Sequence, residues 1–236
     1  MKDSIAILLA AGTGSRLLPI TDKIPKPLVK VFGKPMIETN IEALQANGIK
    51  DIYIVVGYKK EIFSYLQDKY AGIHFVENPE YDIKNNISSV YALGDIVGSA
   101  DCFISDADLV IEDNSIYASD FVKPGFVVKY IKEATQEWFF ETDEALTVTG
   151  LKRGGEDGYN MADISFWPQA DGIKLREIIK EEYLSGKSDN LLWEQVASKY
   201  FEELKPTVYN INRTAITEVD TVDDLAKLDP DWEKFN

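Results

Sequence analysis

The sequence predicts an α/β fold in which helices flank a mixed, mostly parallel sheet that carries an inserted antiparallel portion. In residues 1–124, short apolar segments alternate with segments of helical spacing, which is the order typical of βαβ units. The apolar segments are continuous rather than alternating, as expected of parallel strands that are buried on both faces. In residues 125–236, several strand-like segments are separated only by turns, which favours antiparallel pairing there.

The elements of the first half are predicted from apolar runs and their stop signals. Residues 4–9 form an apolar strand that ends in Ala-Ala-Gly, where a loop begins. Ile37, Ile41 and Leu44 recur at helical spacing, and Asn47-Gly48 supplies the stop. We expect strands at 4–9, 51–56, 73–76 and 101–105, and helices at 36–46, 61–70 and 88–96.

The second half is predicted to be richer in strands. We expect strands at 125–131, 137–141, 145–151, 162–167 and 207–210, and helices at 172–184, 190–201 and 222–228. The sequence shows no repeat, low-complexity tract or linker. We therefore expect one domain over residues 1–236, built from a half at 1–124 and a half at 125–236.

Composition narrows the function classes. The 236 residues include 25 Lys and Arg against 40 Asp and Glu, a net charge of −15. This balance argues against nucleic acid or an anionic membrane as a partner, because clustered Lys and Arg hold phosphate backbones. The apolar run 5–11 is far shorter than the ~20 residues that span a bilayer, and it lacks the flanks of a signal peptide. With Cys102 as the single cysteine, no intramolecular disulfide or CxxC metal site can form, and we expect a cytoplasmic protein.

Small residues and two cations follow the first predicted strand. Residues 10–14, Ala-Ala-Gly-Thr-Gly, let backbone amides approach a ligand closely, and consecutive amides can cradle phosphate oxygens. Arg16 and Lys26, both expected to be exposed in a cleft, could neutralise the leaving pyrophosphate of a triphosphate. The loop lacks the third glycine of a dinucleotide fingerprint and the Gly-Lys-Ser/Thr of a Walker A loop. A plain turn that binds nothing is the alternative at this point.

Acidic residues follow a later strand and precede the last helix. Asp106 and Asp108 come directly after the strand predicted at 101–105, where open α/β sheets bind ligands. If the strand continues, both carboxylates project to one side. Mg²⁺ takes one or two carboxylates together with substrate phosphate oxygens. Asp220 precedes the helix at 222–228, so a role as helix N-cap is an equal alternative to a role as metal ligand.

Taken together, these motifs resemble the signature of the Rossmann-like nucleotidyltransferases that make nucleoside-diphospho sugars and alcohols. The residues that carry the resemblance are Leu9-Ala-Ala-Gly-Thr-Gly-Ser-Arg16, Pro19, Thr21, Pro25-Lys26-Pro27-Leu28 and Gly33-Lys34-Pro35. Within that superfamily the chain is similar to the bacterial CTP:phosphocholine cytidylyltransferases. The supporting motifs are Val56-Gly57-Tyr58, Asn85-Asn86-Ile87-Ser88-Ser89, Asp106-Ala107-Asp108, Glu137-Trp138-Phe139, Ser165-Phe166-Trp167 and Glu218-Val219-Asp220.

The resemblance implies Mg²⁺-dependent transfer of CMP from CTP to a small zwitterionic aminoalkyl phosphate or phosphonate, with release of pyrophosphate. It implies catalytic roles for Arg16, on the departing phosphates, and Lys26, on the acceptor phosphate. It also implies that Asp108 and Asp220 bind the metal, with Asp106 in support. The residues that it places around the nucleotide are Leu9, Ala10, Ala11, Gly12, Gly14, Ser15, Asn86 and Ser88. For the Asn85–Asn86 pair, capping of the following helix is an equal alternative.

The acceptor pocket is expected to use aromatic side chains. A quaternary ammonium binds against aromatic faces, and a flanking carboxylate such as Glu141 adds attraction. The candidate acceptor residues are Trp138, Glu141, Tyr159, Trp167 and Trp193. On pattern alone, Trp167 and Trp193 would be core residues. Residues 154–161 are rich in carboxylates, and a primary ammonium needs hydrogen-bond acceptors, so 2-aminoethylphosphonate and phosphoethanolamine are alternatives to phosphocholine.

Three other functions stay open. A sugar-1-phosphate nucleotidylyltransferase shares the first-half motif, but it would need polar groups for sugar hydroxyls where this chain offers aromatics and acids. A non-catalytic, nucleotide-binding regulatory domain would have no need of Arg16, Lys26, Asp108 and Asp220 together. A glycosyltransferase could use Asp106-Ala107-Asp108 as a metal-binding motif. Nothing in the sequence indicates an oligomeric state.

Overall fold

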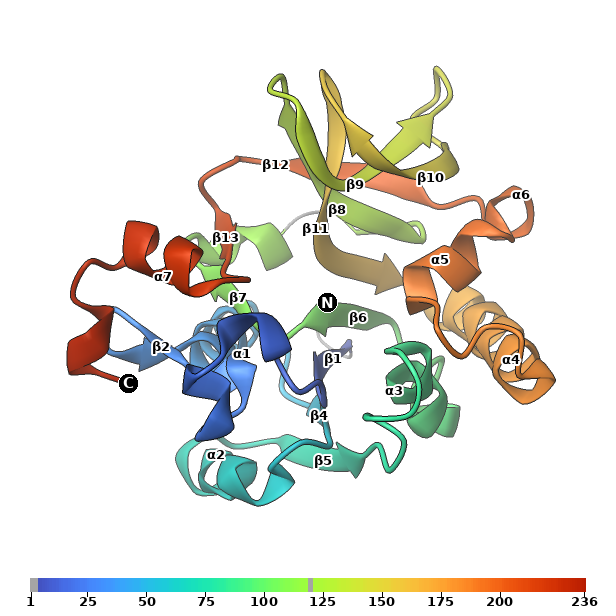
Figure 1. Cartoon of the computed structure of the whole chain (residues 1–236). Helices are drawn as coiled ribbons and strands as arrows, with labels where there is room; N and C mark the ends of the chain where they lie inside the picture. The colour runs from blue at the N-terminus through green and yellow to red at the C-terminus, as the bar shows by residue number, and fades with distance from the viewer. Residues whose placement is uncertain (1–3, 119–120) are drawn as a thin grey trace.

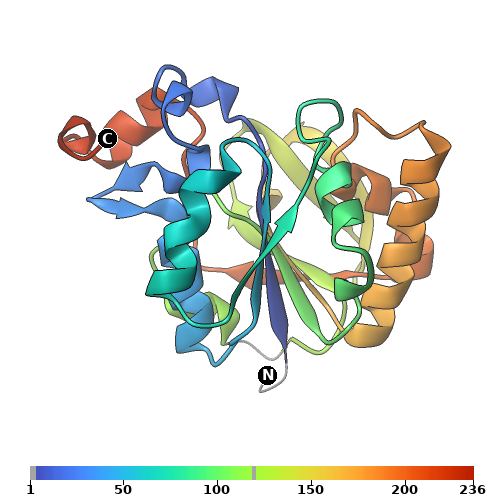
Figure 2. The same cartoon turned by 90° about the horizontal axis from the view of Figure 1, so that it is seen from below.

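The computed structural model describes residues 4–118 and 121–236, and its centre is a twisted sheet with helices on both sides (Figure 1, Figure 2). In its parallel part, β1 pairs with β4 on one side and β6 on the other, and β4 pairs with β5. These strands are β1 (Ile5–Ala10), β4 (Ile52–Val56), β5 (Ile73–Glu77) and β6 (Cys102–Asp106). In the strand order β5-β4-β1-β6, the chain adds β4 and β5 on one side of β1 and then β6 on its other side. Sheets of this kind bind ligands at such a switch point, which here lies between β1 and β6.

The strand β1 is buried on both faces. Ala6 and Leu8 belong to the apolar cluster on one face, whereas Ile5 and Ile7 belong to the cluster on the other. Burial of each large aliphatic side chain contributes about 1.5–3 kcal/mol. Figure 2 shows the helices of the two layers, which are α1 (Met36–Ala46) and α2 (Tyr65–Lys69) on one face, and α3 (Ile87–Ala92) and α4 (Gln169–Ser185) on the other.

Antiparallel strands of the second half extend the same sheet. β11 pairs with β8 and β9 along its first residues and with β6 along its last ones, where Ile164 lies opposite Ser105. The hairpins of this portion rise away from the parallel strands in Figure 1. The strands are β8 (Gly125–Ile131), β9 (Thr135–Thr142), β10 (Val148–Gly155), β11 (Gly158–Trp167) and β12 (Thr207–Ile211), of which β12 runs parallel to β8. The predicted fold class is confirmed.

Several predicted boundaries differ from the observed ones. The strand predicted at 162–167 begins at Gly158, and the strand predicted at 145–151 begins only at Val148. The helix predicted at 61–70 opens with a 3-10 turn, and the helix predicted at 88–96 ends at Ala92. The helix predicted at 190–201 splits into α5 (Trp193–Ser198) and α6 (Phe201–Leu204), because the chain turns between them to bring Phe201 and Leu204 into the core.

Short elements that the sequence did not indicate position the last acidic residues. β7 (Leu109–Ile111) pairs with β13 (Ile216–Glu218) in the antiparallel sense, with Glu218 opposite Leu109. This pairing carries the chain after β13 back to the end of β6. Two further short strands, β2 (Lys30–Val31) and β3 (Lys34–Pro35), pair with each other, whereas the helix α7 (Val222–Leu228) has the predicted bounds. Within the described ranges, no helix is both long and apolar enough to cross a membrane.

Candidate active site

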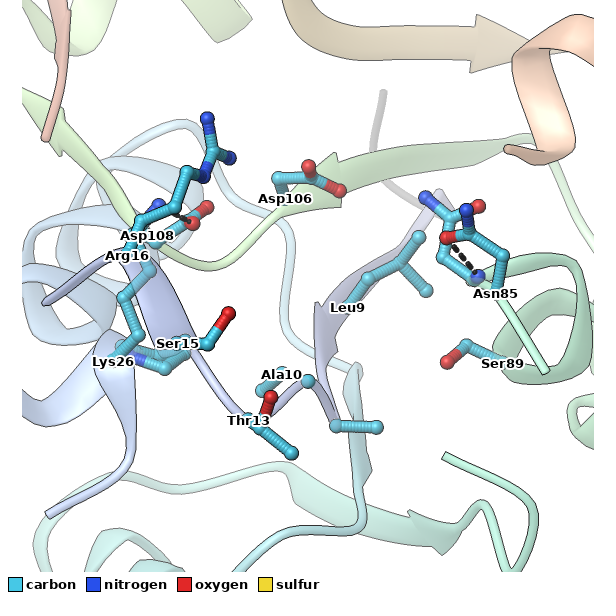
Figure 3. A pocket seen from close by; sticks show the side chains of 15 residues that line it. Leu9, Ala10, Thr13, Ser15, Arg16, Lys26, Asn85, Ser89, Asp106 and Asp108 are labelled. Atoms are coloured by element: carbon cyan, nitrogen blue, oxygen red, sulfur yellow. Dashed lines mark hydrogen bonds and ion pairs between the residues drawn. The ribbon is translucent and has the colours of Figure 1, made fainter. Parts of the chain in front are cut away.

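The loop after β1 forms one wall of a cavity of about 300 Å³ (Figure 3). Gly14 has a φ of +65°, and a Cβ there would lie 2.7 Å from the Cβ of Lys26. Both the left-handed backbone and the close contact therefore require glycine. A Cβ on Gly12 would meet no heavy atom within 4 Å, so the space beside Gly12 is open to a ligand. The residues that line this wall are Leu9 and Ala10, at the end of β1, and Ala11, Gly12, Thr13, Gly14 and Ser15 in the loop.

Two cations lie on short 3-10 turns at one side of this cavity. Arg16 belongs to the turn Ser15–Leu17, and Lys26 begins the turn Lys26–Leu28. The Arg16 side chain is 65% exposed and places Nη1 2.5 Å from Asp220. Figure 3 shows Arg16, Lys26 and Asp108 on the same side. The structure therefore brings together the two cations that the sequence predicted as catalytic.

Lys26 lies between two carboxylates. Its Nζ atom is 2.5 Å from Asp108 and 2.6 Å from Asp220. The prediction that Lys26 is exposed is wrong: the residue is 7% exposed, because it packs under Gly14 and against both acids. Burial acts to lower the pKa of Lys26, but the charges of Asp108 and Asp220 outweigh it and hold that pKa above its ordinary value of 10.5. Lys26 is thus a fixed cation at neutral pH.

Asp220 does not cap the helix that follows it. The N-cap of α7 is Thr221, whose side chain accepts a hydrogen bond from the Asp224 amide, while the Asp224 carboxylate accepts one from the Thr221 amide. This capping box gives hydrogen-bond acceptors to two backbone amides at the start of the helix. The Asp220 carboxylate instead faces Arg16 and Lys26, so the capping alternative is excluded for this residue.

The acids at the end of β6 could take part in metal binding. β6 ends at Asp106, and the chain bends before Asp108, so the two do not continue one strand. Burial, followed by the charge of Asp108, raises the pKa of Asp106 well above its ordinary value. No set of three or more His, Cys, Asp or Glu in the described part of the chain could hold a metal unaided. Asp108 and Asp220 do converge on one cation, the Lys26 ammonium, and such a pair fits Mg²⁺ when phosphate oxygens complete its ligands.

The opposite wall of the cavity comes from the segment before α3. Asn85, Asn86 and Ser89 line it, and Figure 3 shows Asn85 and Ser89 across from Arg16. Asn86 makes no side-chain cap on α3; its Oδ1 accepts a hydrogen bond from the Trp193 amide. Ser88, predicted to contact the nucleotide, lies behind this wall, where it accepts a hydrogen bond from Asn78 and donates one to the Asn85 carbonyl.

A second cavity of about 390 Å³ adjoins the first, and Arg16 and Asp106 line both. Of the predicted acceptor residues, Trp138 lines it. Most of the other wall residues had no predicted role in a site. These are Glu137, Arg153, Asn160, Met161, Asp163, Leu192 and Glu218, joined by Asp220. A charged residue inside the apolar strand predicted at 162–167 was the signal that could have pointed to Asp163.

The other predicted acceptor residues do not line this cavity. Glu141 is exposed and pairs with Lys152 at 2.9 Å. Tyr159 packs on strand β8, with its ring edge-on to Tyr130. Trp167 and Trp193 are buried in the core, with ring centroids 6.2 Å apart. Their apolar strand and helix positions face inward, which is the core placement that the pattern alone favoured for both tryptophans.

The family model for nucleotidyl transferases matches residues 5–142, which include the glycine loop, both cations and the acids after β6. The chain belongs to the nucleotidyl transferase family and is an enzyme of that class.

Relatives of this chain cover almost its whole length. The 2-aminoethylphosphonate cytidylyltransferase of Lancefieldella rimae is 37% identical over 95% of this chain and 91% of the relative. The choline-phosphate cytidylyltransferase of Streptococcus pneumoniae is 35% identical over 95% and 96%. A solved structure of the CTP:phosphocholine cytidylyltransferase from Streptococcus pneumoniae matches with a TM-score of 0.89 at 35% identity, covering 96% of this chain and 98% of that one. The resemblance noted in the sequence is confirmed.

Proposed function

We propose that the protein transfers CMP from CTP to a small zwitterionic aminoalkyl phosphate or phosphonate in the cytoplasm, in a Mg²⁺-dependent reaction that releases pyrophosphate. The observation that carries the proposal is the adjacency of two cavities that share Arg16 and Asp106. One is lined by the glycine loop and both cations, as a nucleotide site would be. The other offers an aromatic ring and several carboxylates, which suit a substrate with a positive end. The names of the two relatives point to the same reaction.

In the proposed reaction, a phosphate or phosphonate oxygen of the acceptor attacks the α-phosphorus of CTP. The new P–O bond forms as the bond from the α-phosphorus to the bridging oxygen breaks, and pyrophosphate leaves with that electron pair. The nucleophile is already an anion, so no side chain has to remove a proton. The protein therefore contributes by holding two anions in line and neutralising their charge.

Each cation has a separate part in that neutralisation. Lys26 is buried and fixed between Asp108 and Asp220, so it can hold the acceptor phosphate at a constant position. Arg16 is mostly exposed and can turn from Asp220 toward the departing phosphates. Asp108 and Asp220, supported by Asp106, would hold Mg²⁺, which when bound neutralises charge on the α and β phosphates.

Pyrophosphate release tests the proposal. The purified protein is given CTP and Mg²⁺ with phosphocholine, 2-aminoethylphosphonate or phosphoethanolamine, and, in parallel, UTP or dTTP with glucose 1-phosphate. We expect release with CTP and at least one zwitterionic acceptor. Turnover only with the sugar phosphate would establish the sugar nucleotidylyltransferase alternative. CTP binding without turnover of any acceptor would establish a regulatory domain.

A further inference from the structure

One carboxylate close to the acceptor cavity has an oxygen atom without a partner; it is not a wall residue, but its charge acts on the wall residue Asp106. Glu194, near the start of α5, is 5% exposed, and its Oε2 atom has no hydrogen-bond partner among the residues that the structure describes. Burial of an ionised carboxylate without a compensating group is unfavourable, so such a group tends to keep its proton. A cation that enters with a ligand would compensate this charge.

The other carboxylate, Asp163, lines the cavity itself, where an irregular strand re-aims its side chain. Asp163 lines the cavity and has a φ of +54°. It lies where β11 shifts register, between the pairs Met161–Val128 and Ser165–Phe126, and such bulges re-aim side chains. Because Ile164 lies opposite Ser105, Asp163 comes beside the end of β6.

The two carboxylates act on each other electrostatically. Burial raises the pKa of Glu194 to about 8, and the charge of Asp163 adds to the increase. Burial, with the charges of Asp106 and Asp108, raises the pKa of Asp163 to about 8 as well. Lys129 lowers the pKa of Asp163 but does not offset these effects. Without a cation beside them both acids tend to keep their protons, and the approach of a cation would favour their ionised forms.

The aromatic surface of the cavity is small by comparison. Trp138 is the one aromatic side chain among the described residues of its wall, and the Arg153 guanidinium already lies 5.8 Å from the centre of that ring. A quaternary ammonium has no N–H group and depends on aromatic faces, whereas a primary ammonium donates three hydrogen bonds. The wall offers acceptor oxygens rather than an aromatic cage.

We propose that Asp163 and Glu194 bind the ammonium group of the acceptor and make the enzyme prefer a primary aminoethyl phosphate or phosphonate over phosphocholine. The inference rests on the proposed cytidylyl transfer and specifies its substrate class. With the acceptor phosphate held by Lys26, the ammonium end extends into the second cavity, toward these two acids.

The test compares acceptors that differ only in N-methylation. With CTP and Mg²⁺, kcat/KM is measured for phosphoethanolamine and its mono-, di- and trimethyl derivatives. Each methyl group removes one N–H donor, so we expect kcat/KM to fall stepwise and to be at least about tenfold lower for phosphocholine, which is about 1.4 kcal/mol. A flat series, or one that rises toward phosphocholine, would overturn the inference.

Variants assign the effect to the two acids. Glu194→Gln and Asp163→Asn keep the side-chain shape, and we expect each to raise KM for phosphoethanolamine at least about tenfold while KM for CTP stays unchanged. The control Glu141→Gln removes an exposed carboxylate outside the cavity and should change neither value. If a variant raised KM equally for phosphoethanolamine and for phosphocholine, the substituted acid would have a merely structural role, and the assignment would be contradicted. If wild-type protein released no pyrophosphate with any acceptor, the proposed function itself would fail, a result distinct from a flat methylation series.

Discussion

Arg16 and Asp220 are separated by 204 positions in the chain, yet their side chains form an ion pair of 2.5 Å where the two cavities meet. The pairing of β7 with β13 brings the C-terminal acid back to the N-terminal loop. Because the Arg16 side chain is 65% exposed, water screens the pair, and such pairs contribute about 0–1 kcal/mol. Little stability is lost when Arg16 leaves Asp220 for a phosphate group.

Arg16 and Lys26 should respond differently to substitution. We expect Arg16→Ala to lower kcat at least about 100-fold, as loss of one transition-state charge partner does, without changing the melting temperature Tm. Lys26→Met should lower kcat at least as much and also lower Tm, because Asp108 and Asp220 lose the cation between them. Steady-state kinetics and thermal unfolding measure both effects.

The control for Arg16→Ala is Arg213→Ala, which removes another exposed arginine from an ion pair, the one with Glu133. It should leave both kcat and Tm unchanged. Full activity of either Arg16→Ala or Lys26→Met would refute the phosphate-binding roles.

Asp108→Asn should abolish metal-dependent turnover. A neutral amide is a poorer Mg²⁺ ligand than a carboxylate, so neither saturating Mg²⁺ nor excess CTP should restore the rate. Calorimetry should show that Mg²⁺ no longer strengthens CTP binding. The matched control Asp95→Asn lies at an almost fully exposed carboxylate and should keep its Mg²⁺ dependence. An Asp108→Asn enzyme with the wild-type Mg²⁺ response would remove this residue from the metal site.

Substitution of the two loop glycines should affect different properties, stability at Gly14 and CTP binding at Gly12. Gly14→Ala needs a left-handed backbone and a Cβ 2.7 Å from Lys26, so we expect a loss of about 1–3 kcal/mol in stability. Gly12→Ala meets no neighbour and should keep its Tm, but its methyl group should raise KM for CTP about tenfold or more. Thermal unfolding and CTP titration of both variants make the comparison. A wild-type KM for Gly12→Ala would show that the nucleotide does not approach this loop.

Stability should fall as the pH rises. Asp163 and Glu194 have pKa values raised to about 8 from ordinary values of 3.8 and 4.5, first of all by burial. The unfolded chain ionises them near those ordinary values, so between about pH 4 and pH 8 the folded protein binds more protons. The stabilising contribution of the protonated groups is complete below about pH 4 and is lost as the pH approaches 8. Tm of the ligand-free protein should decrease over this range, by about 2–4 °C for each kcal/mol lost.

The double variant Asp163→Asn/Glu194→Gln tests the origin of this decrease. It should flatten the plot of Tm against pH, because neither side chain titrates. If the double variant kept the wild-type slope, these two groups would not be its cause.

The parallel half of the fold could be predicted because strands that are buried on both faces, such as β1 and β4, consist of continuous apolar runs. The glycine loop was predictable for a similar local reason, since the conformation of Gly14 and the approach at Gly12 depend on residue type. The placement of Arg16 and Lys26 beside the glycine loop could be predicted because both are close to it in the sequence. The burial of Lys26 could not, because it depends on Asp220, which only the tertiary structure brings near.

The acceptor side was harder to predict. An aromatic residue serves a core and a pocket equally well, and only the packing shows that Trp138 lines the cavity whereas Trp167 and Trp193 fill the core. Asp163 reaches the cavity through a register shift in β11, which depends on the neighbouring strands. Glu194 becomes a candidate through the missing partner of its Oε2 atom, a property that no sequence pattern carries.

The most direct test of the proposed reaction is ³¹P NMR of the enzyme with CTP, Mg²⁺ and 2-aminoethylphosphonate. We predict that the phosphonate signal of the acceptor is replaced by that of a phosphonate joined to CMP, while an equal amount of pyrophosphate accumulates. An unchanged acceptor signal, with CTP either intact or hydrolysed to CMP, would contradict cytidylyl transfer to this class of acceptor.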